Sequence, residues 1–219
     1  EIARRMAAGQ SLDGIPGTVI MSKEAPAGAK MLPPEEEVIS SKETFSEFYR
    51  LFYRNQYRVL AQSAGKRYIV HYPYYDNISS SDLDGIYELP YMREPHPVYT
   101  ESIPAFEMIC NSLTAHRGCV SGCSFCSLTL HQGKKIISRT PASVLREIDI
   151  IAKKSYFKGY ITDIGGPSAN MYGYACKKGW HCPRESCLFP SPCPNLEMSS
   201  EQWLDLLSKA SKKKNIKKV

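Results

Sequence analysis

The stretch TPASVLREIDIIAKKSYFKGYITDIGG, residues 140–166, decides the fold. Thr140 followed by Pro141 predicts a helix start, because threonine caps exposed backbone N–H groups and proline fits the first helical turn. We expect this helix to run to about residue 155, and its apolar face recurs at helical spacing: Val144, Ile148, Ile151 and Ala152. Gly159 ends the helical segment, and residues 160–166 read as a strand that closes on two glycines.

Another apolar segment, FEMICNSLT at residues 106–114, reads as a buried strand ahead of the helix. Strand, loop, helix and strand in this order predict a right-handed parallel βαβ unit. Further along, Ser199 and Gln202 have the spacing of a capping box, and residues 215–219 look like a third strand just beginning. So short a parallel sheet leaves an open edge. We therefore expect an α/β fold that is a partial (β/α) barrel, in a chain that is a fragment of a larger protein.

The N-terminal half reads as an α+β segment. Its expected elements are a strand at 17–23, a loop at 25–41, a helix at 42–54, two strands within 58–73 and an ordered connector at 73–107. The apolar face of the helix is expected to lie in a core: Phe45, Phe48, Leu51 and Phe52. We place the N-terminal segment and connector at residues 1–105 and the partial barrel at 106–219, with a cysteine-rich insertion at about 174–196.

Composition points to a soluble, cytoplasmic protein. Hydrophobic residues make up 42% of the 219 residues and charged residues 23%, which are ordinary globular values. No apolar run is long enough for a membrane span, and the first residues lack the apolar core of a secretory signal. The net charge of +6 comes from six lysines near the C-terminus, at 209, 212, 213, 214, 217 and 218. Because the rest of the chain is balanced, nucleic-acid binding is not indicated.

The segment RGCVSGCSFCSLTLHQGKK, residues 117–135, gathers Cys119, Cys123 and Cys126 within eight positions. Clustered cysteines in a reducing compartment usually bind metal. Gly118 and Gly122 give the backbone the freedom to loop around a small centre. A closed zinc site needs a fourth ligand, and the nearest candidates, His116 and His131, match no familiar zinc spacing. A four-iron cluster held by three cysteines instead leaves one iron open for chemistry.

A second, more loosely spaced group lies in the insertion: Cys176, Cys182, Cys187 and Cys193. Prolines between these cysteines discourage helix, and so long a loop needs something to fix it. Three interpretations stay open: a structural zinc site, an auxiliary iron–sulfur cluster, or free or disulfide-linked thiols. We interpret His181 as a neighbour of this group rather than a ligand. Cys110 lies inside the expected strand and is interpreted as an inert buried residue.

The triplet Cys-x3-Cys-x2-Cys, with the aromatic Phe125 before its last cysteine, resembles the signature of radical S-adenosylmethionine (SAM) enzymes. The chain is most similar to the YgiQ-type branch of that superfamily. Four segments resemble segments of that branch and occur in the same order: LPYMREPHPVY (89–99), residues 117–140, GGPSANMYG (165–173) and RESCLFPSPCPNL (184–196).

The resemblance implies that the three cysteines of the triplet ligate three irons of a 4Fe-4S cluster. SAM would bind the fourth iron, Gly165 and Gly166 would receive its methionine amino group, and Phe125 would lie near its adenine. Pro167 stands where that glycine motif has an acid, so no role can be assigned to a carboxylate at this position. One electron, from a donor such as flavodoxin or ferredoxin, would cleave SAM to a 5′-deoxyadenosyl radical. The substrate stays open, and the alternative is a non-catalytic zinc- or iron–sulfur-binding module.

Overall fold

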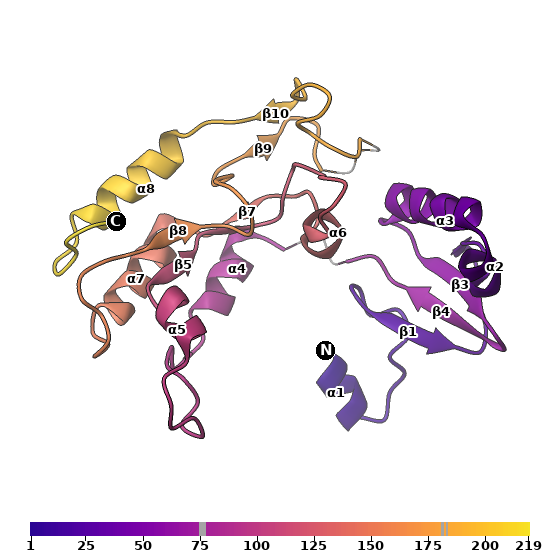
Figure 1. The fold of residues 1–219 in the computed structure, drawn as a ribbon, viewed down its shortest axis with the longest axis horizontal. Helices are drawn as coiled ribbons and strands as arrows, with labels where there is room; N and C mark the ends of the chain where they lie inside the picture. The colour runs from indigo at the N-terminus through magenta and orange to yellow at the C-terminus, as the bar shows by residue number, and fades with distance from the viewer. Residues whose placement is uncertain (75–77, 181, 183) are drawn as a thin grey trace. The chain divides into compact units, whose positions relative to one another are not determined.

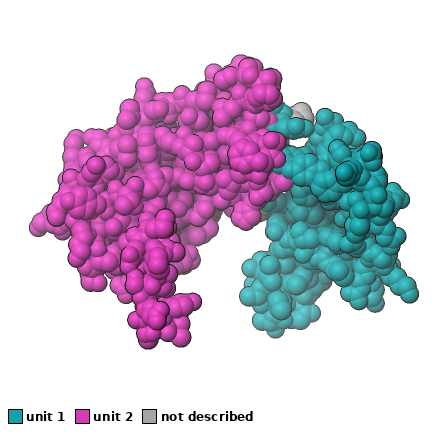
Figure 2. Space-filling view, viewed as in Figure 1, with its two compact units in different colours: residues 1–77, 181–185 teal, residues 78–180, 186–219 magenta. Residues whose placement is uncertain are grey.

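The computed structural model describes residues 1–74, 78–180, 182 and 184–219. The chain divides into two compact units, coloured separately in Figure 2. The first comprises residues 1–77 and 181–185, and the second comprises 78–180 and 186–219. Contacts thus group residues 78–105 with the second unit, whereas the sequence places them in an N-terminal segment. Among the described residues, no helix is long and apolar enough to cross a membrane.

The first unit is built around a four-stranded sheet of order β1-β4-β3-β2 (Figure 1). Its elements are α1 (Ile2–Ala7), β1 (Val19–Ser22), β2 (Lys30–Met31), α2 (Glu35–Ser40), α3 (Lys42–Asn55), β3 (Leu60–Ala64) and β4 (Arg67–His71). The expected pair of strands is confirmed as the β3–β4 hairpin, whose turn needs Gly65 because φ there is +56°. The buried side chains Ala61, Val70 and Tyr72 form the core beneath the sheet.

Two expectations for the first unit are corrected. The segment 25–41 is not all loop, since it contains β2 and α2. Helix α2 begins after Pro34, and its first turn carries three glutamates that complement the positive end of the helix dipole. Helix α3 forms as expected, but it has no buried residue among those described, and Phe45 is 55% exposed. The other three residues of the face, Phe48, Leu51 and Phe52, are half-buried, and the Phe52 ring packs edge-on against His71 of β4 with ring centroids 5.5 Å apart.

The second unit contains the remaining elements. They are α4 (Ser80–Tyr87), α5 (Pro104–Ile109), β5 (Ser112–Thr114), β6 (His116–Arg117), α6 (Leu128–Gln132), β7 (Ile137–Ser138), α7 (Pro141–Ile151), β8 (Asp163–Gly165), β9 (Ala175–Cys176), β10 (Leu196–Glu197) and α8 (Glu201–Ser211). The described strands of this unit form two-stranded sheets: β5 with β8, β6 with β7 and β9 with β10.

The predicted βαβ unit is confirmed in its order and strand direction. Strand β5 pairs parallel with β8, and helix α7 lies between them in the chain. Thr140 is the N-cap of α7, and its hydroxyl accepts a hydrogen bond from the backbone N of Ser143. The apolar face of α7 packs with Leu113 and Ile164 of the two strands in one core. In the segment expected as a third strand, Lys218 forms a parallel bridge with Tyr160. The described strands form no closed barrel.

Three local expectations in this unit are wrong. The segment 106–114 is not one strand, because Pro104 starts helix α5 and leaves three residues for β5. Cys110 therefore caps α5, half-buried, and its thiol contacts the carbonyl oxygen of Glu107 at 3.6 Å. The capping box at Ser199 does not form, since Ser200 occupies the N-cap of α8 without a side-chain bond.

The expected connector at 73–107 contains helix α4, which docks on the start of α7. The buried carboxylate of Asp84 accepts hydrogen bonds from the backbone N and hydroxyl of Thr140, at 3.0 and 2.6 Å. Farther along, Arg93 pairs with Glu147 of α7 at 3.0 Å. These two contacts explain why the connector belongs to the second unit.

Candidate functional site

The cysteine triplet lies in the loop that joins β6 to β7. These strands pair antiparallel, so the loop leaves and returns at one place. Gly118 begins it with φ +92°, and a Cβ atom there would stand 2.0 Å from the carbonyl oxygen of Lys135. Only glycine fits this closure. The backbone N of Cys119 then donates to the carbonyl oxygen of Gly133 at 3.1 Å, which holds the first cysteine at the base of the loop.

The three thiols differ in exposure. Cys119 is buried, Cys126 is half-buried and Cys123 is exposed. A turn bond of 3.0 Å from Cys126 N to the carbonyl oxygen of Cys123 keeps the last two close in the backbone, and φ at Gly122 is +60°. The Phe125 side chain is 90% exposed. Three thiolates on one short loop are the donor set of a cubane cluster, so these residues fit such a group.

No three His, Cys, Asp or Glu side chains among the described residues converge on a position for one metal ion. A single tetrahedral ion with bonds of about 2.3 Å would draw its sulfur ligands to one point. In a cubane each cysteine binds a different iron, so its sulfurs need not meet.

The loop after β8 reaches the same cysteines. Register pairs Thr114 with Gly165, and the backbone N of Ala115 donates to the carbonyl oxygen of Gly165 at 2.6 Å. Beyond the glycines, the Ser168 hydroxyl lies 3.4 Å from the sulfur of Cys119. The carboxyl ends of the two parallel strands thus carry both the cysteine loop and the glycine loop, at the edge where α/β sheets place their sites.

His116 also lies at this edge of the sheet. The sequence identified it only as a weak candidate for a zinc ligand. Its side chain is fully buried, and neither ring nitrogen makes a hydrogen bond of normal geometry. Burial lowers the pKa of His116, against a weaker opposing effect of the nearby Ala169 backbone. A Cβ atom on Gly166 would stand 2.1 Å from this imidazole. Packing against this imidazole therefore leaves no room for a side chain at residue 166.

The second cysteine group packs partly on the first. The backbone N of Cys187 donates to the carbonyl oxygen of Val120 at 2.9 Å, and Cys193 N donates to the carbonyl oxygen of Cys187 at 2.8 Å. Both side chains join Cys119 in one apolar cluster. Cys176 lies in β9, opposite Leu196 of β10. Cys182 falls in the first unit by its contacts, so it is not placed relative to the other three, and His181 lies outside the described residues.

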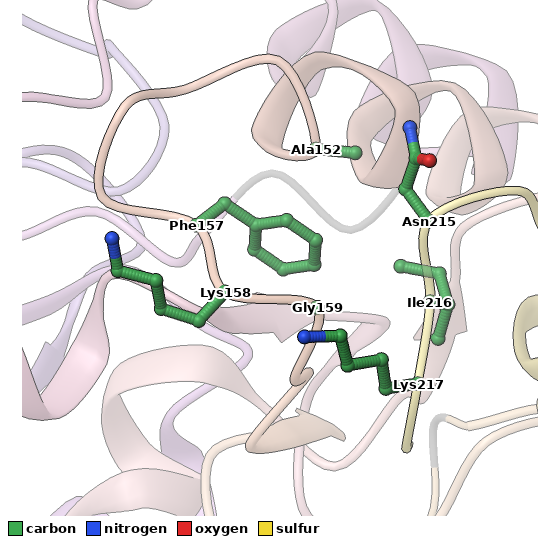
Figure 3. Close-up of a pocket in the computed structure, with 7 residues that line it drawn as sticks. All are labelled: Ala152, Phe157, Lys158, Gly159, Asn215, Ile216 and Lys217. Atoms are coloured by element: carbon green, nitrogen blue, oxygen red, sulfur yellow. The ribbon is translucent and has the colours of Figure 1, made fainter.

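A hollow of about 460 Å³ lies elsewhere in the second unit. It is lined by Ala152, Phe157, Lys158, Gly159, Asn215, Ile216 and Lys217. The Phe157 ring points toward Ile216, whereas the Lys158 side chain points away from it (Figure 3). These residues lead into Tyr160, at the beginning of the strand segment and opposite its glycine end. In α/β barrels the functional sites lie at the opposite, carboxyl end of the strands.

Comparisons with known proteins place the chain in a family. The family model described as Radical SAM N-terminal matches residues 1–112, which ends before the first cysteine of the triplet. A UPF0313 protein of Geobacter sulfurreducens is 44% identical over 94% of this chain and 36% of its own length. UPF0313 proteins of Methanocella arvoryzae and Porphyromonas gingivalis are 42% and 39% identical, over 86% and 100% of this chain.

The chain covers 33% and 37% of these last two relatives, so it spans about a third of the curated proteins it matches. No solved structure matches it. The expected resemblance is confirmed by the family model together with relatives that extend across the cysteines: the chain belongs to the Radical SAM N-terminal family and, with its UPF0313 relatives, to the YgiQ-type branch of the radical SAM superfamily.

Proposed function

We propose that this chain holds a 4Fe-4S cluster through Cys119, Cys123 and Cys126 and presents it to SAM. The observation that carries the proposal is the 3.4 Å contact between the Cys119 sulfur and Ser168, which joins the cysteine loop to the loop that begins Gly165-Gly166. A metal centre and a nucleotide-binding backbone at one sheet edge are the two parts that the reaction needs. When bound, the reduced cluster supplies the electron that cleaves SAM to methionine and a 5′-deoxyadenosyl radical.

The chain's own residues would bind and shield these groups. Cys119 anchors the buried side of the site, with Val120 and Ile136 in the apolar cluster around it. Cys123 and Phe125 stand on the exposed side, where Phe125 is available to stack on an adenine ring. The backbone of Gly165 and Gly166 would accept the methionine amino group. We propose that a protein of the flavodoxin or ferredoxin type donates the electron to the cluster. The substrate is not assigned, because it would also contact parts of the longer protein.

The proposal is tested by the electron paramagnetic resonance spectrum of the anaerobically reconstituted, dithionite-reduced protein. SAM should change the spectrum, because its amino and carboxylate groups would bind the iron that no cysteine holds. Methylthioadenosine, which lacks both groups, is the matched control and should leave the spectrum unchanged. A spectrum insensitive to SAM contradicts the proposal.

Elemental analysis of the same preparation distinguishes the proposed iron–sulfur enzyme from the alternative, a non-catalytic metal-binding module. Zinc without iron or sulfide would make the chain a non-catalytic metal-binding module. In the second cysteine group we propose a metal as well, and Cys187→Ala should then lower the zinc or iron content without removing the SAM-dependent signal.

A further inference from the structure

The sulfur of Cys119 sits in an apolar setting with a hydroxyl beside it. Cys119 is 4% exposed and packs with Val120, Ile136, Met171 and Leu196 in one cluster. The hydroxyl oxygen of Ser168 lies 3.4 Å from the sulfur, within the range of a hydrogen bond to sulfur. Ser168 is itself exposed at the surface of the loop.

The direction of this hydrogen bond depends on the state of the cysteine. In the thiol form either atom can donate. A cysteine that ligates iron is a thiolate and has no proton, so only the Ser168 hydroxyl can donate and the sulfur must accept. Hydrogen bonds from neutral donors to an ionised acceptor are stronger than those between neutral groups. The contact should therefore tighten when Cys119 binds metal.

The fold holds Ser168 in place from both sides. Upstream, Gly165 is fixed by the pairing of β8 with β5, and Gly166 is packed against the buried His116 ring. Downstream, the buried Tyr172 donates its hydroxyl to the carbonyl oxygen of Arg139 at 2.7 Å. A loop fixed at both ends presents the hydroxyl to the sulfur at little cost in conformational entropy.

We infer that Ser168 is a positioning residue that donates a hydrogen bond to the Cys119 thiolate and raises the reduction potential of the bound cluster. This inference rests on the proposed function. Reduction adds one electron and hence one negative charge, part of which resides on the sulfur ligands. A donor to one of these sulfurs stabilises the reduced form more than the oxidised form, and such bonds are among the factors that set cluster potentials.

The test is an equilibrium redox titration of the reconstituted chain, with dithionite as the one-electron source and the reduced-cluster signal as readout. Ser168→Ala should lower the equilibrium constant for reduction about tenfold, which corresponds to about 59 mV for one electron. Ser168→Thr keeps the hydroxyl at this exposed position and should restore the wild-type potential. Ser127→Ala is the matched control, because Ser127 follows Cys126 but makes no side-chain cap bond.

The outcomes separate this inference from the proposed function. Equal potentials for the wild type and Ser168→Ala, with equal iron content, overturn the inference and leave the cluster in place. Equal shifts in Ser168→Ala and Ser168→Thr also overturn it, since the hydroxyl would not be the cause. A wild-type chain that takes up no iron overturns the proposed function itself.

Discussion

At the scale of single residues, the His116 ring occupies the space that a side chain at residue 166 would need, at the end of the β5–β8 pair. A Cβ atom at 166 would come within 2.1 Å of the imidazole, far inside contact distance. We expect Gly166→Ala to destabilise the chain by about 1–3 kcal/mol, the usual cost of overpacking a buried site. The free energy of unfolding in urea measures this.

Two further variants make that measurement specific. Because His116→Ala vacates the space, the double variant should be less destabilised than the sum of the two single changes. Gly85→Ala is the control: it lies inside α4, where a Cβ atom would meet nothing within 4 Å, so alanine should raise stability by up to about 1 kcal/mol. Strictly additive effects of the His116 and Gly166 changes would contradict the packing account.

The burial of His116 also predicts a pH dependence of stability. The folded state holds the His116 pKa below its usual 6.5, so the unfolded chain binds a proton more readily. Stability should therefore fall as the pH drops from about 6.5 toward the lowered folded-state pKa, and level off below it. His116→Asn should flatten that part of the profile in the metal-free protein, measured by urea unfolding between pH 7.5 and 5.

His131 supplies the comparison, because it is an exposed histidine of α6 in the same loop. His131→Asn changes an exposed side chain and should leave the free energy of unfolding at pH 7.5 unchanged. His71 of the first unit, whose pKa burial also lowers, keeps its own contribution in both variants. If His116→Asn and the wild type lose stability in parallel on acidification, the imidazole is not the group responsible.

At the scale of elements, the docking of the connector on α7 depends on an ion-pair network. Glu147 pairs with Arg93 at 3.0 Å and with Arg139, whose side chain is 0% exposed. The Arg139 guanidinium also donates to Ser143 and to the carbonyl oxygen of Thr114 in β5. Glu147→Gln leaves buried positive charge without its counterion, so we expect a loss of about 3 kcal/mol in unfolding free energy.

The matched control is Glu88→Gln, which breaks an ion pair with Arg146 whose two side chains are 44% and 56% exposed. Solvent screens such a pair, and its loss should cost less than about 1 kcal/mol. Similar destabilisation in both variants, measured in the same urea titrations, would refute the role given to the Glu147 network.

Elements with a local signal were predictable from the sequence. The Thr140-Pro141 start and apolar spacing identified α7, and Gly65 between two strand patterns identified the β3–β4 hairpin. Helix α5 was missed because a short apolar run suits helix and strand alike, and only Pro104 decides between them. The segment with α2 looked like loop because its prolines precede the helix rather than interrupt it.

The candidate site divides in the same way. The cysteine spacing and the paired glycines are visible in the sequence. The contact of Ser168 with Cys119, and of Gly166 with His116, arises only when β5 and β8 pair in register. Each contact joins residues that are far apart in the chain, so no local sequence pattern could predict it.

At the scale of the whole molecule, the chain is two compact units that together span about a third of its UPF0313 relatives. In the second unit, the β5–β8 pair and the bridge of Tyr160 to Lys218 are parallel pairings of an α/β fold, and the described strands form no barrel. We propose that further strands of the relatives continue this sheet. In the proposed function, cluster binding needs only residues of this chain, whereas a substrate would also contact those further strands.

The most direct measurement is therefore the iron and sulfide content of the anaerobically reconstituted chain and its cysteine variants. Relative to the wild type, Cys119→Ala, Cys123→Ala and Cys126→Ala should each lose about four irons and four sulfides per chain. Cys110→Ala, a half-buried cysteine that caps α5 outside both groups, should lose none. If all three triplet variants keep the wild-type content, the triplet does not hold a cluster and the account is wrong.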